Sequence, residues 1–211
     1  MQPSELKQGA PEWKNFKLGK VSASRVADLM AKTKSGESAS RKNYMMELLC
    51  ERLTGTREEG FVTAAMSRGS ELEQIARSAF EVDHGVMVKE VGCFVCLGID
   101  SFIASPDGLV NDDGLLEIKC FNTSNHVEVL RTGKIDNRYQ IQMLCQMLCT
   151  GRRHCFFVSF DDRLPDPLQY TCIRFDFDIK RADEILSEVQ KFLLELDQLE
   201  IEMTQLMQKA A

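Results

Sequence analysis

SPDGLVNDDGLLEIK, residues 105–119, is the stretch on which the expected fold and site depend. Its acid Asp107 follows a proline, at the end of a predicted strand that covers Ile99–Ala104. The residues Asn-Asp-Asp-Gly at 111–114 predict a tight turn, because asparagine and glycine tolerate a positive φ. Residues 115–120 are then expected to return as a second strand, so the stretch predicts a hairpin.

The second strand of this hairpin carries an acid and a lysine on one face. Side chains alternate between the faces of a strand, so Glu117 and Lys119 point one way and the apolar residues between and beside them point the other. Asp107 and Glu117 can then share a divalent cation through their oxygens. Lys119 would hold or deprotonate a water beside that ion, as metal-assisted phosphodiester hydrolysis requires. The alternative is an ordinary hairpin with a solvated polar face, although two close carboxylates without a cation are unfavourable.

The composition is that of a globular protein with a sizeable core. The chain has 211 residues, of which 44% are hydrophobic and 27% charged, and this length predicts a single domain over residues 1–211. Residues 1–12 are polar and irregular, and we expect them to be flexible. The sequence shows neither an apolar run of membrane-spanning length nor a hydrophobic signal core, which predicts a cytoplasmic protein without membrane contact.

The net charge and the cysteines bear on the class of partner and of site. A net charge of −6 argues against a long non-specific nucleic-acid surface, although a local basic patch is enough for an enzyme that acts on DNA. The eight cysteines lie scattered in apolar segments, as buried reduced thiols do. Cys93 and Cys96 form a CxxC, but no second cysteine or histidine pair stands at zinc spacing, so a structural metal is not expected.

Periodicity predicts that helices and strands alternate along the chain. Patterns typical of helices cover residues 22–30, 43–53, 64–82, 137–150 and 179–208. Patterns typical of strands cover residues 87–95, 97–104, 115–120, 154–161 and 170–178. This order predicts an α/β protein that ends in one long helix, with residues 87–120 forming a meander that leads into the hairpin.

The motifs of the chain resemble those of a known nuclease superfamily. Pro106-Asp107 followed by Glu117-Ile118-Lys119 resembles the signature of the PD-(D/E)XK nucleases. The string SPDGL at 105–109, with the ordered motifs from Trp13 to Phe160, resembles the lambda exonuclease branch, which comprises phage-type alkaline exonucleases and YqaJ-like viral recombinases. The resemblance implies a restriction-endonuclease-like fold, in which a twisted mixed β-sheet is flanked by helices.

The resemblance implies a site with two Mg²⁺ ions, for which Mn²⁺ would substitute. Their ligands would be Asp107, Glu117, Glu73 of a Gly-x-x-x-Glu motif, and the carbonyl of Ile118. Lys119 would position and deprotonate the attacking water, with a pKa lowered by its cationic neighbours. Gln140, in a segment that is similar to the family's Gln-x-Gln, would orient water or phosphate.

The resemblance also implies a site for the 5′-phosphate of DNA. Lys17, Ser24 and Ser105 would hold this phosphate. They would do so beside a helix start for which Ser22 is the expected N-cap. The family more often has arginine where Lys17 stands, and lysine offers a point charge in place of a bidentate fork. Lys34, in the polar loop that follows, would contact DNA. Without the resemblance, Lys17 is a solvated lysine and the two serines near the helix start are capping residues.

A family member of this kind is expected to be a 5′→3′ exonuclease. It would degrade one strand of linear double-stranded DNA from a 5′-phosphate end to 5′-mononucleotides and leave 3′ single-stranded overhangs. The resemblance implies a ring-shaped homotrimer around DNA and a single-strand annealing protein as partner, in a bacterial host cell that carries the phage or prophage. Two alternatives stay open, an endonuclease with the same metal site and a non-catalytic DNA-binding or partner-docking module of a recombination complex.

Overall fold

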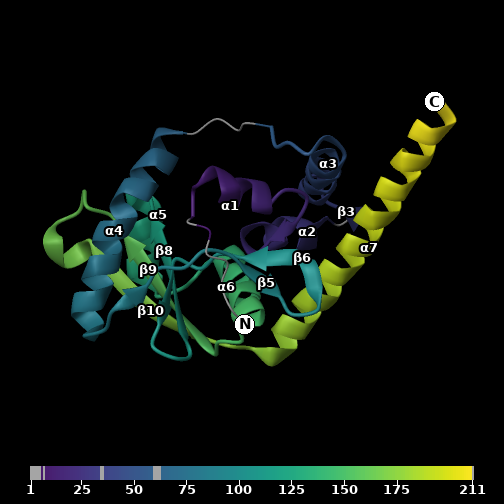
Figure 1. Cartoon of the computed structure of the whole chain (residues 1–211). Coiled ribbons are helices and arrows are strands. Elements are labelled where there is room, and N and C mark those ends of the chain that lie inside the picture. Colours follow the sequence, from purple (N-terminus) through teal and green to yellow (C-terminus); the bar gives the residue numbers. More distant parts are fainter. Residues whose placement is uncertain (1–5, 7, 34–35, 59–62, 211) are drawn as a thin grey trace.

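The computed structural model describes residues 6, 8–33, 36–58 and 63–210, and its main feature is a mixed sheet between helices (Figure 1). The strand order in this sheet is β10 (Tyr170–Asp176), β9 (His154–Phe160), β8 (Gly114–Cys120), β7 (Gly108–Val110) and β4 (Val88–Lys89). β8 and β9 are parallel, whereas the other neighbours are antiparallel. The predicted α/β class with a mixed sheet is therefore confirmed.

A second sheet contains three strands, in the order β1 (Val21–Ser22), β6 (Ile99–Ala104) and β5 (Phe94–Cys96). A separate two-residue ladder joins β2 (Lys32–Thr33) to β3 (Gly36–Glu37). The predicted meander is wrong, because β5 and β6 belong to the second sheet and β8 belongs to the main sheet. β6 pairs in parallel with β1, a strand from about eighty residues earlier in the chain.

Different helices cover the two faces of β8. Leu116 and Ile118 join a buried cluster with side chains of α4 (Ala64–His84). Leu115 lies on the opposite face, in a larger cluster with side chains of α6 (Asn137–Thr150). Side chains alternate along the strand, so Glu117 and Lys119, two and four residues after Leu115, also face α6.

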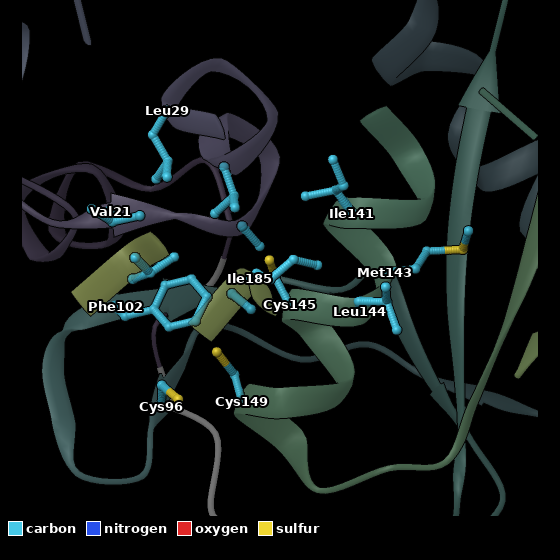
Figure 2. Close-up of a cluster of buried hydrophobic side chains, with 14 of the residues drawn as sticks. Val21, Leu29, Cys96, Phe102, Ile141, Met143, Leu144, Cys145, Cys149 and Ile185 are labelled. Atoms are coloured by element: carbon cyan, nitrogen blue, oxygen red, sulfur yellow. The ribbon is translucent and has the colours of Figure 1, made fainter. Parts of the chain in front are cut away.

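The larger cluster gathers around α6 (Figure 2). Leu144 and Cys145 of this helix are fully buried, as are Phe102 of β6 and Val21 of β1. Helix α7 (Ile179–Ala210) packs against the same cluster, with its buried residues Ala182, Ile185, Val189, Phe192, Leu193 and Leu196. The predicted long C-terminal helix is thus confirmed, and its last turns extend past the body of the protein (Figure 1).

The remaining helical elements are η1 (Ala23–Arg25), α2 (Val26–Met30), α3 (Ala39–Thr54) and η2 (Asp166–Leu168), together with α1 (Pro11–Phe16) and α5 (Thr123–Thr132). The sequence patterns did not indicate α1 or α5. In the described part of the chain, no helix has both the length and the apolar character that crossing a membrane requires.

Residues 1–12 differ in part from the expected flexible segment. The side-chain amide of Gln8 donates to the carbonyl of Val91 at 3.1 Å and to that of Pro106 at 2.9 Å. α1 begins three residues later, with a proline at its first position. The chain is therefore docked from Gln8 onward, whereas residues 1–5 and 7 lie outside the described part.

The turn between β7 and β8 is fixed from outside the hairpin. Asn111 has the positive φ of 48° that the sequence predicts for this turn. Gly114 is needed for a different reason, because a Cβ atom there would lie 2.7 Å from Nε2 of His154. Nη1 of Arg152 donates to three carbonyls of the turn at 3.2, 2.9 and 2.6 Å, those of Val110, Asn111 and Gly114.

The Arg152→Ala substitution is expected to lower the free energy of unfolding by about 1–2 kcal/mol, because charge-assisted hydrogen bonds to the turn are lost. Chemical denaturation measures this difference. Arg153→Ala is the matched control, since Arg153 is exposed and its guanidinium lies 5.8 Å from the ring centre of Phe177. The control is expected to change stability by less than about 1 kcal/mol. Equal effects of the two substitutions would contradict the role of Arg152.

Candidate active site

Both the backbone and the side chain of Asp107 form hydrogen bonds with β8. Its amide donates to the carbonyl of Leu116 at 3.0 Å, and its Oδ2 accepts from the amide of Ile118 at 2.6 Å. Burial and the negative charge of Glu117 raise the pKa of Asp107 well above its usual value. Because the amide and the carbonyl of one strand residue point to the same side, the Ile118 carbonyl also points to the side of Asp107.

Glu117 is completely buried and is surrounded by nitrogen donors. Nε2 of Gln142 donates to its Oε1 at 2.6 Å, and Nε2 of Gln146 donates to its Oε2 at 2.6 Å. Nζ of Lys119 lies 2.5 Å from Oε1. Residues four apart share one face of a helix, so α6 presents both amides to this one carboxylate.

Lys119 is an ammonium group held between acids. Burial lowers its pKa, but the carboxylates of Glu117 and Asp107 outweigh this effect, so the pKa is raised above the usual value. The predicted lowering by cationic neighbours is not produced by the protein side chains, because the charges nearest to Lys119 are negative. In this arrangement Lys119 can attract and orient an anion or a water.

Glu73 joins the site from α4. Burial raises its pKa, the positive charge of Arg77 lowers it, and the charge of Glu117 raises it further. Nη2 of Arg77 lies 2.8 Å from Oε1 of Glu73. The Arg77 side chain is buried and also reaches Glu90 at 3.2 Å and the carbonyl of Asp107 at 3.4 Å. Arg77 therefore links the acid of α4 to the hairpin, a role that the sequence did not indicate.

Gln140, the predicted glutamine, is not the one that contacts Glu117. Its Nε2 donates to a backbone carbonyl five residues earlier at 2.7 Å, and its Oε1 accepts from Arg181 of α7 at 2.7 Å. An α-helix turns by about 100° per residue, so Gln140 and Gln142 point about 200° apart. The Gln-x-Gln segment reaches the site through Gln142, and Gln146 follows one turn later.

A cavity of about 100 Å³ opens beside Gln142. Lys17, Ser24 and Ser105 all line it, so the structure brings together the three residues predicted to hold a terminal phosphate. The other lining residues are Gln8, Trp13, Ser22, Ala23 and Gln142. The indole Nε1 of Trp13 is buried and has no hydrogen-bond partner among the described residues.

Lys17 brings a positive charge to this cavity. Its Nζ lies 3.9 Å from the ring centre of Trp13, and burial lowers its pKa from 10.5 to about 8. The hydroxyls of Ser22 and Ser24 are 3.2 Å apart. Ser22 occupies the predicted N-cap position of η1, but its side chain makes no capping hydrogen bond. Lys34, the predicted DNA contact, lies outside the described residues.

The oxygen donors of the site fit a hard divalent cation in their chemistry. Asp107, Glu117 and Glu73 act on one another electrostatically, and the Ile118 carbonyl adds a neutral oxygen. Within the described ranges, however, no three acids, cysteines or histidines are already grouped as a metal site. Three donors already contact the carboxylate of Glu117, two at Oε1 and one at Oε2, so a cation would share this carboxylate with them.

Known structures resemble the fold of this chain over most of its length. The crystal structure of an alkaline exonuclease, LHK-Exo, from Laribacter hongkongensis has 50% sequence identity and a TM-score of 0.90 and covers 96% of this chain and 100% of that chain. LHK-Exo in complex with dAMP gives 50% identity and a TM-score of 0.91 over the same shares. A phage-related exonuclease from Haemophilus somnus 129PT, with 18% identity, a TM-score of 0.64 and coverage of 87% and 96%, shares the fold.

The sequence comparison identifies the family. No curated protein matches the chain. Residues 12–153, more than half of the sequence, match the family described as the YqaJ-like viral recombinase domain. This segment contains the hairpin, the glutamines of α6 and the lysine of the cavity. The chain therefore belongs to the YqaJ-like viral recombinase family, as its motifs predicted.

Proposed function

We propose that this protein is a Mg²⁺-dependent 5′→3′ exonuclease that degrades one strand of linear double-stranded DNA to 5′-mononucleotides and leaves 3′ overhangs. The observation that carries the proposal is the position of Gln142. Its amide holds Glu117 at 2.6 Å, and its side chain also lines the cavity that contains Lys17 and Ser24. If the terminal phosphate binds in this cavity, the next phosphodiester bonds of the strand would lie near Asp107 and Glu117.

Each part of the site has its own role in this proposal. Two Mg²⁺ ions would be held by Asp107, Glu117, Glu73 and the carbonyl of Ile118. When bound, the metal supplies neutralisation of phosphate charge and a more acidic water, and Mn²⁺ would substitute. The ammonium of Lys119 orients the attacking water. Lys17, Ser24 and Ser105 hold the 5′-phosphate.

The relatives and the charge of the chain support the wider proposal. LHK-Exo is an alkaline exonuclease whose structure was determined with dAMP, a nucleotide of the expected product class. We further propose a ring-shaped homotrimer that passes the overhang to a single-strand annealing protein in a bacterial host that carries the phage or prophage. A closed ring would keep a chain of net charge −6 on DNA without a large basic surface.

A time course of DNA degradation tests this function. The substrates are linear duplex with 5′-phosphate ends, linear duplex with 5′-hydroxyl ends, and covalently closed circular duplex, each with Mg²⁺ or Mn²⁺. We expect the 5′-phosphate duplex to be degraded fastest, mononucleotides to appear, and the circle to survive. Cleavage of the circle would indicate an endonuclease, and no degradation with either ion would favour a non-catalytic module.

The preference for 5′-phosphate ends is expected to fall as the pH rises through the pKa of Lys17. That pKa is about 8, so the amine is charged at about pH 7 and has lost most of its charge at about pH 9. The ratio of kcat/KM for phosphate ends over hydroxyl ends should therefore drop by up to about tenfold between these pH values. In Lys17→Arg protein the charge persists, so its ratio should stay constant. A wild-type ratio that is equally constant would contradict this role of Lys17.

A further inference from the structure

The wall of the phosphate cavity that carries Lys17, Ser22 and Ser24 is not built from long regular elements. Residues 17–25 form a turn, a two-residue strand and a short 3₁₀-helix. The turn is closed by a hydrogen bond of 3.2 Å from the amide of Lys20 to the carbonyl of Lys17. This bond is local. The later part of the wall is fixed by β6, which pairs with Val21 and Ser22, whereas the position of the turn depends on the elements packed against it.

Helix α3 holds both polar backbone groups of one residue in this wall. The amide of Gly19 donates to Oε2 of Glu51 at 2.8 Å, and Nε of Arg52 donates to the carbonyl of Gly19 at 3.0 Å. Gly19 is buried with a φ of 66°, and a Cβ atom there would lie 2.5 Å from Cγ of Arg52. Consecutive residues of α3 thus fix a single glycine that lies two positions after Lys17.

The two charges that hold Gly19 are balanced by other charged side chains. Oε1 of Glu51, an almost fully buried acid, accepts from Nε of Arg57 at 2.5 Å. Nη1 of Arg52 lies 2.7 Å from Asp197 and 2.9 Å from Glu200, both on α7. Neither Glu51 nor Arg52 lines the cavity. Arg52 therefore acts on a ligand through the backbone of the wall, whereas Glu51 acts through the backbone and also through its charge, which raises the pKa of Lys17.

A second contact holds the far end of the same wall. The amide of Ser22 donates to the hydroxyl of Tyr44 at 3.0 Å, and Tyr44 is also on α3. Nη1 of Arg25 pairs with Glu47 of this helix at 3.0 Å. α3 therefore holds the wall both close to Lys17 and close to Ser24, and the Gly19 contact is the one next to the charged group.

We propose that Glu51 and Arg52 are positioning residues for recognition of the 5′-phosphate, which they serve by fixing Gly19 and thereby the ammonium of Lys17. This inference rests on the proposed preference for 5′-phosphate ends. Removal of either side chain lets the turn shift, so Lys17 no longer meets the phosphate at hydrogen-bond distance. The hairpin of Asp107 and Glu117 lies outside these contacts and keeps its geometry.

The test compares kcat/KM for linear duplex with 5′-phosphate and with 5′-hydroxyl ends, in Mg²⁺, for the full chain and its variants. Glu51→Ala and Arg52→Met are each expected to lower the phosphate-to-hydroxyl ratio by about tenfold, through KM, which corresponds to the loss of one well-placed interaction. The rate on hydroxyl ends should change by less than about threefold. Glu51→Gln keeps one acceptor oxygen where the wild type has two, so either the Gly19 amide or Nε of Arg57 loses its acceptor, and its ratio should lie between those of Glu51→Ala and the wild type.

A double substitution, Asp197→Asn with Glu200→Gln, is the matched control for α3 itself. It removes the ion pairs of Arg52 with α7 but leaves the hydrogen bond from Nε to Gly19, so the ratio should not change. Thermal melting of each protein accompanies the kinetics. If Glu51→Ala does not fold, the result for Arg52→Met decides.

The outcomes separate this inference from the proposed function. A wild-type enzyme that degrades both kinds of end at the same rate overturns the phosphate preference and the inference with it. A wild-type preference that persists in Glu51→Ala and Arg52→Met overturns the inference alone. Equal losses on both kinds of end, with an unchanged ratio, also overturn it, because they show that the two residues only stabilise the fold.

Discussion

A Glu117→Gln protein is expected to degrade 5′-phosphorylated duplex at least about a thousandfold more slowly than the wild type while it remains folded. The substitution removes the charge that a divalent cation needs and that holds Lys119 at 2.5 Å. Glutamine keeps the volume of the side chain and one of the two acceptor oxygens, and one of the neighbouring amides, of Gln142 or Gln146, can turn its own oxygen to the new NH2 group. The expected loss therefore reflects chemistry and not packing.

Steady-state kinetics with Mg²⁺ measure this loss, and thermal melting confirms that the variant is folded. Glu128→Gln is the matched control, because Glu128 is exposed and pairs only with Arg131 among the ion pairs of the described residues. The control should be as active as the wild type. If Glu117→Gln protein still degraded DNA at the wild-type rate, the hairpin could not be the catalytic centre.

Lys119→Met is expected to reduce kcat by about a hundredfold or more and also to destabilise the protein. Methionine fills similar space but cannot orient a water or balance a charge. Its introduction leaves the carboxylate of Glu117 buried without its cationic partner, which is costly. Because the Lys119 side chain is 26% exposed, water compensates in part, and we expect a loss of about 1–3 kcal/mol in the free energy of unfolding.

A double-mutant cycle separates the two effects of Lys119. Combining Lys119→Met with Glu117→Gln removes the unpaired charge, so stability should return toward that of Glu117→Gln alone, whereas activity should stay low. Chemical denaturation and single-turnover kinetics on the four proteins measure both quantities. Strictly additive losses of stability would contradict direct pairing of the two side chains.

The turn and the polar face of β8 were predictable because they depend on local sequence, whereas the antiparallel partner of β8 is β7 and not the expected strand at 99–104. A turn at 111–114 and alternation along the following strand are enough to put Glu117 and Lys119 on one face. Glu73 and the phosphate-site residues were predicted from motifs, and the structure brings Lys17, Ser24 and Ser105 to one cavity.

The errors have physical causes that the sequence does not display. Gln140 and Gln142 both lie in a polar helix start, and only the packing of α6 on β8 decides which of them faces Glu117. From the sequence alone, Arg77 has the pattern of a solvated helix residue, because its contacts with Glu90 and Asp107 depend on how α4 packs. The departure of β5 and β6 from the main sheet depends on β1, whose two residues pair with a strand about eighty positions away. Such non-local choices leave no periodic signal.

The double contact of Gln142 has a consequence for directed evolution of this protein. Because Gln142 lines the cavity and also donates to Glu117, we expect most substitutions at position 142 to change both the choice of DNA end and the rate of turnover. Lys17 and Ser24 line the same cavity and, within the described part of the chain, form no hydrogen bond or ion pair with the acids of the site, so we expect substitutions there to change the choice of DNA end alone. Selection for tolerance of modified ends should therefore enrich substitutions in the first twenty-five residues and leave α6 untouched.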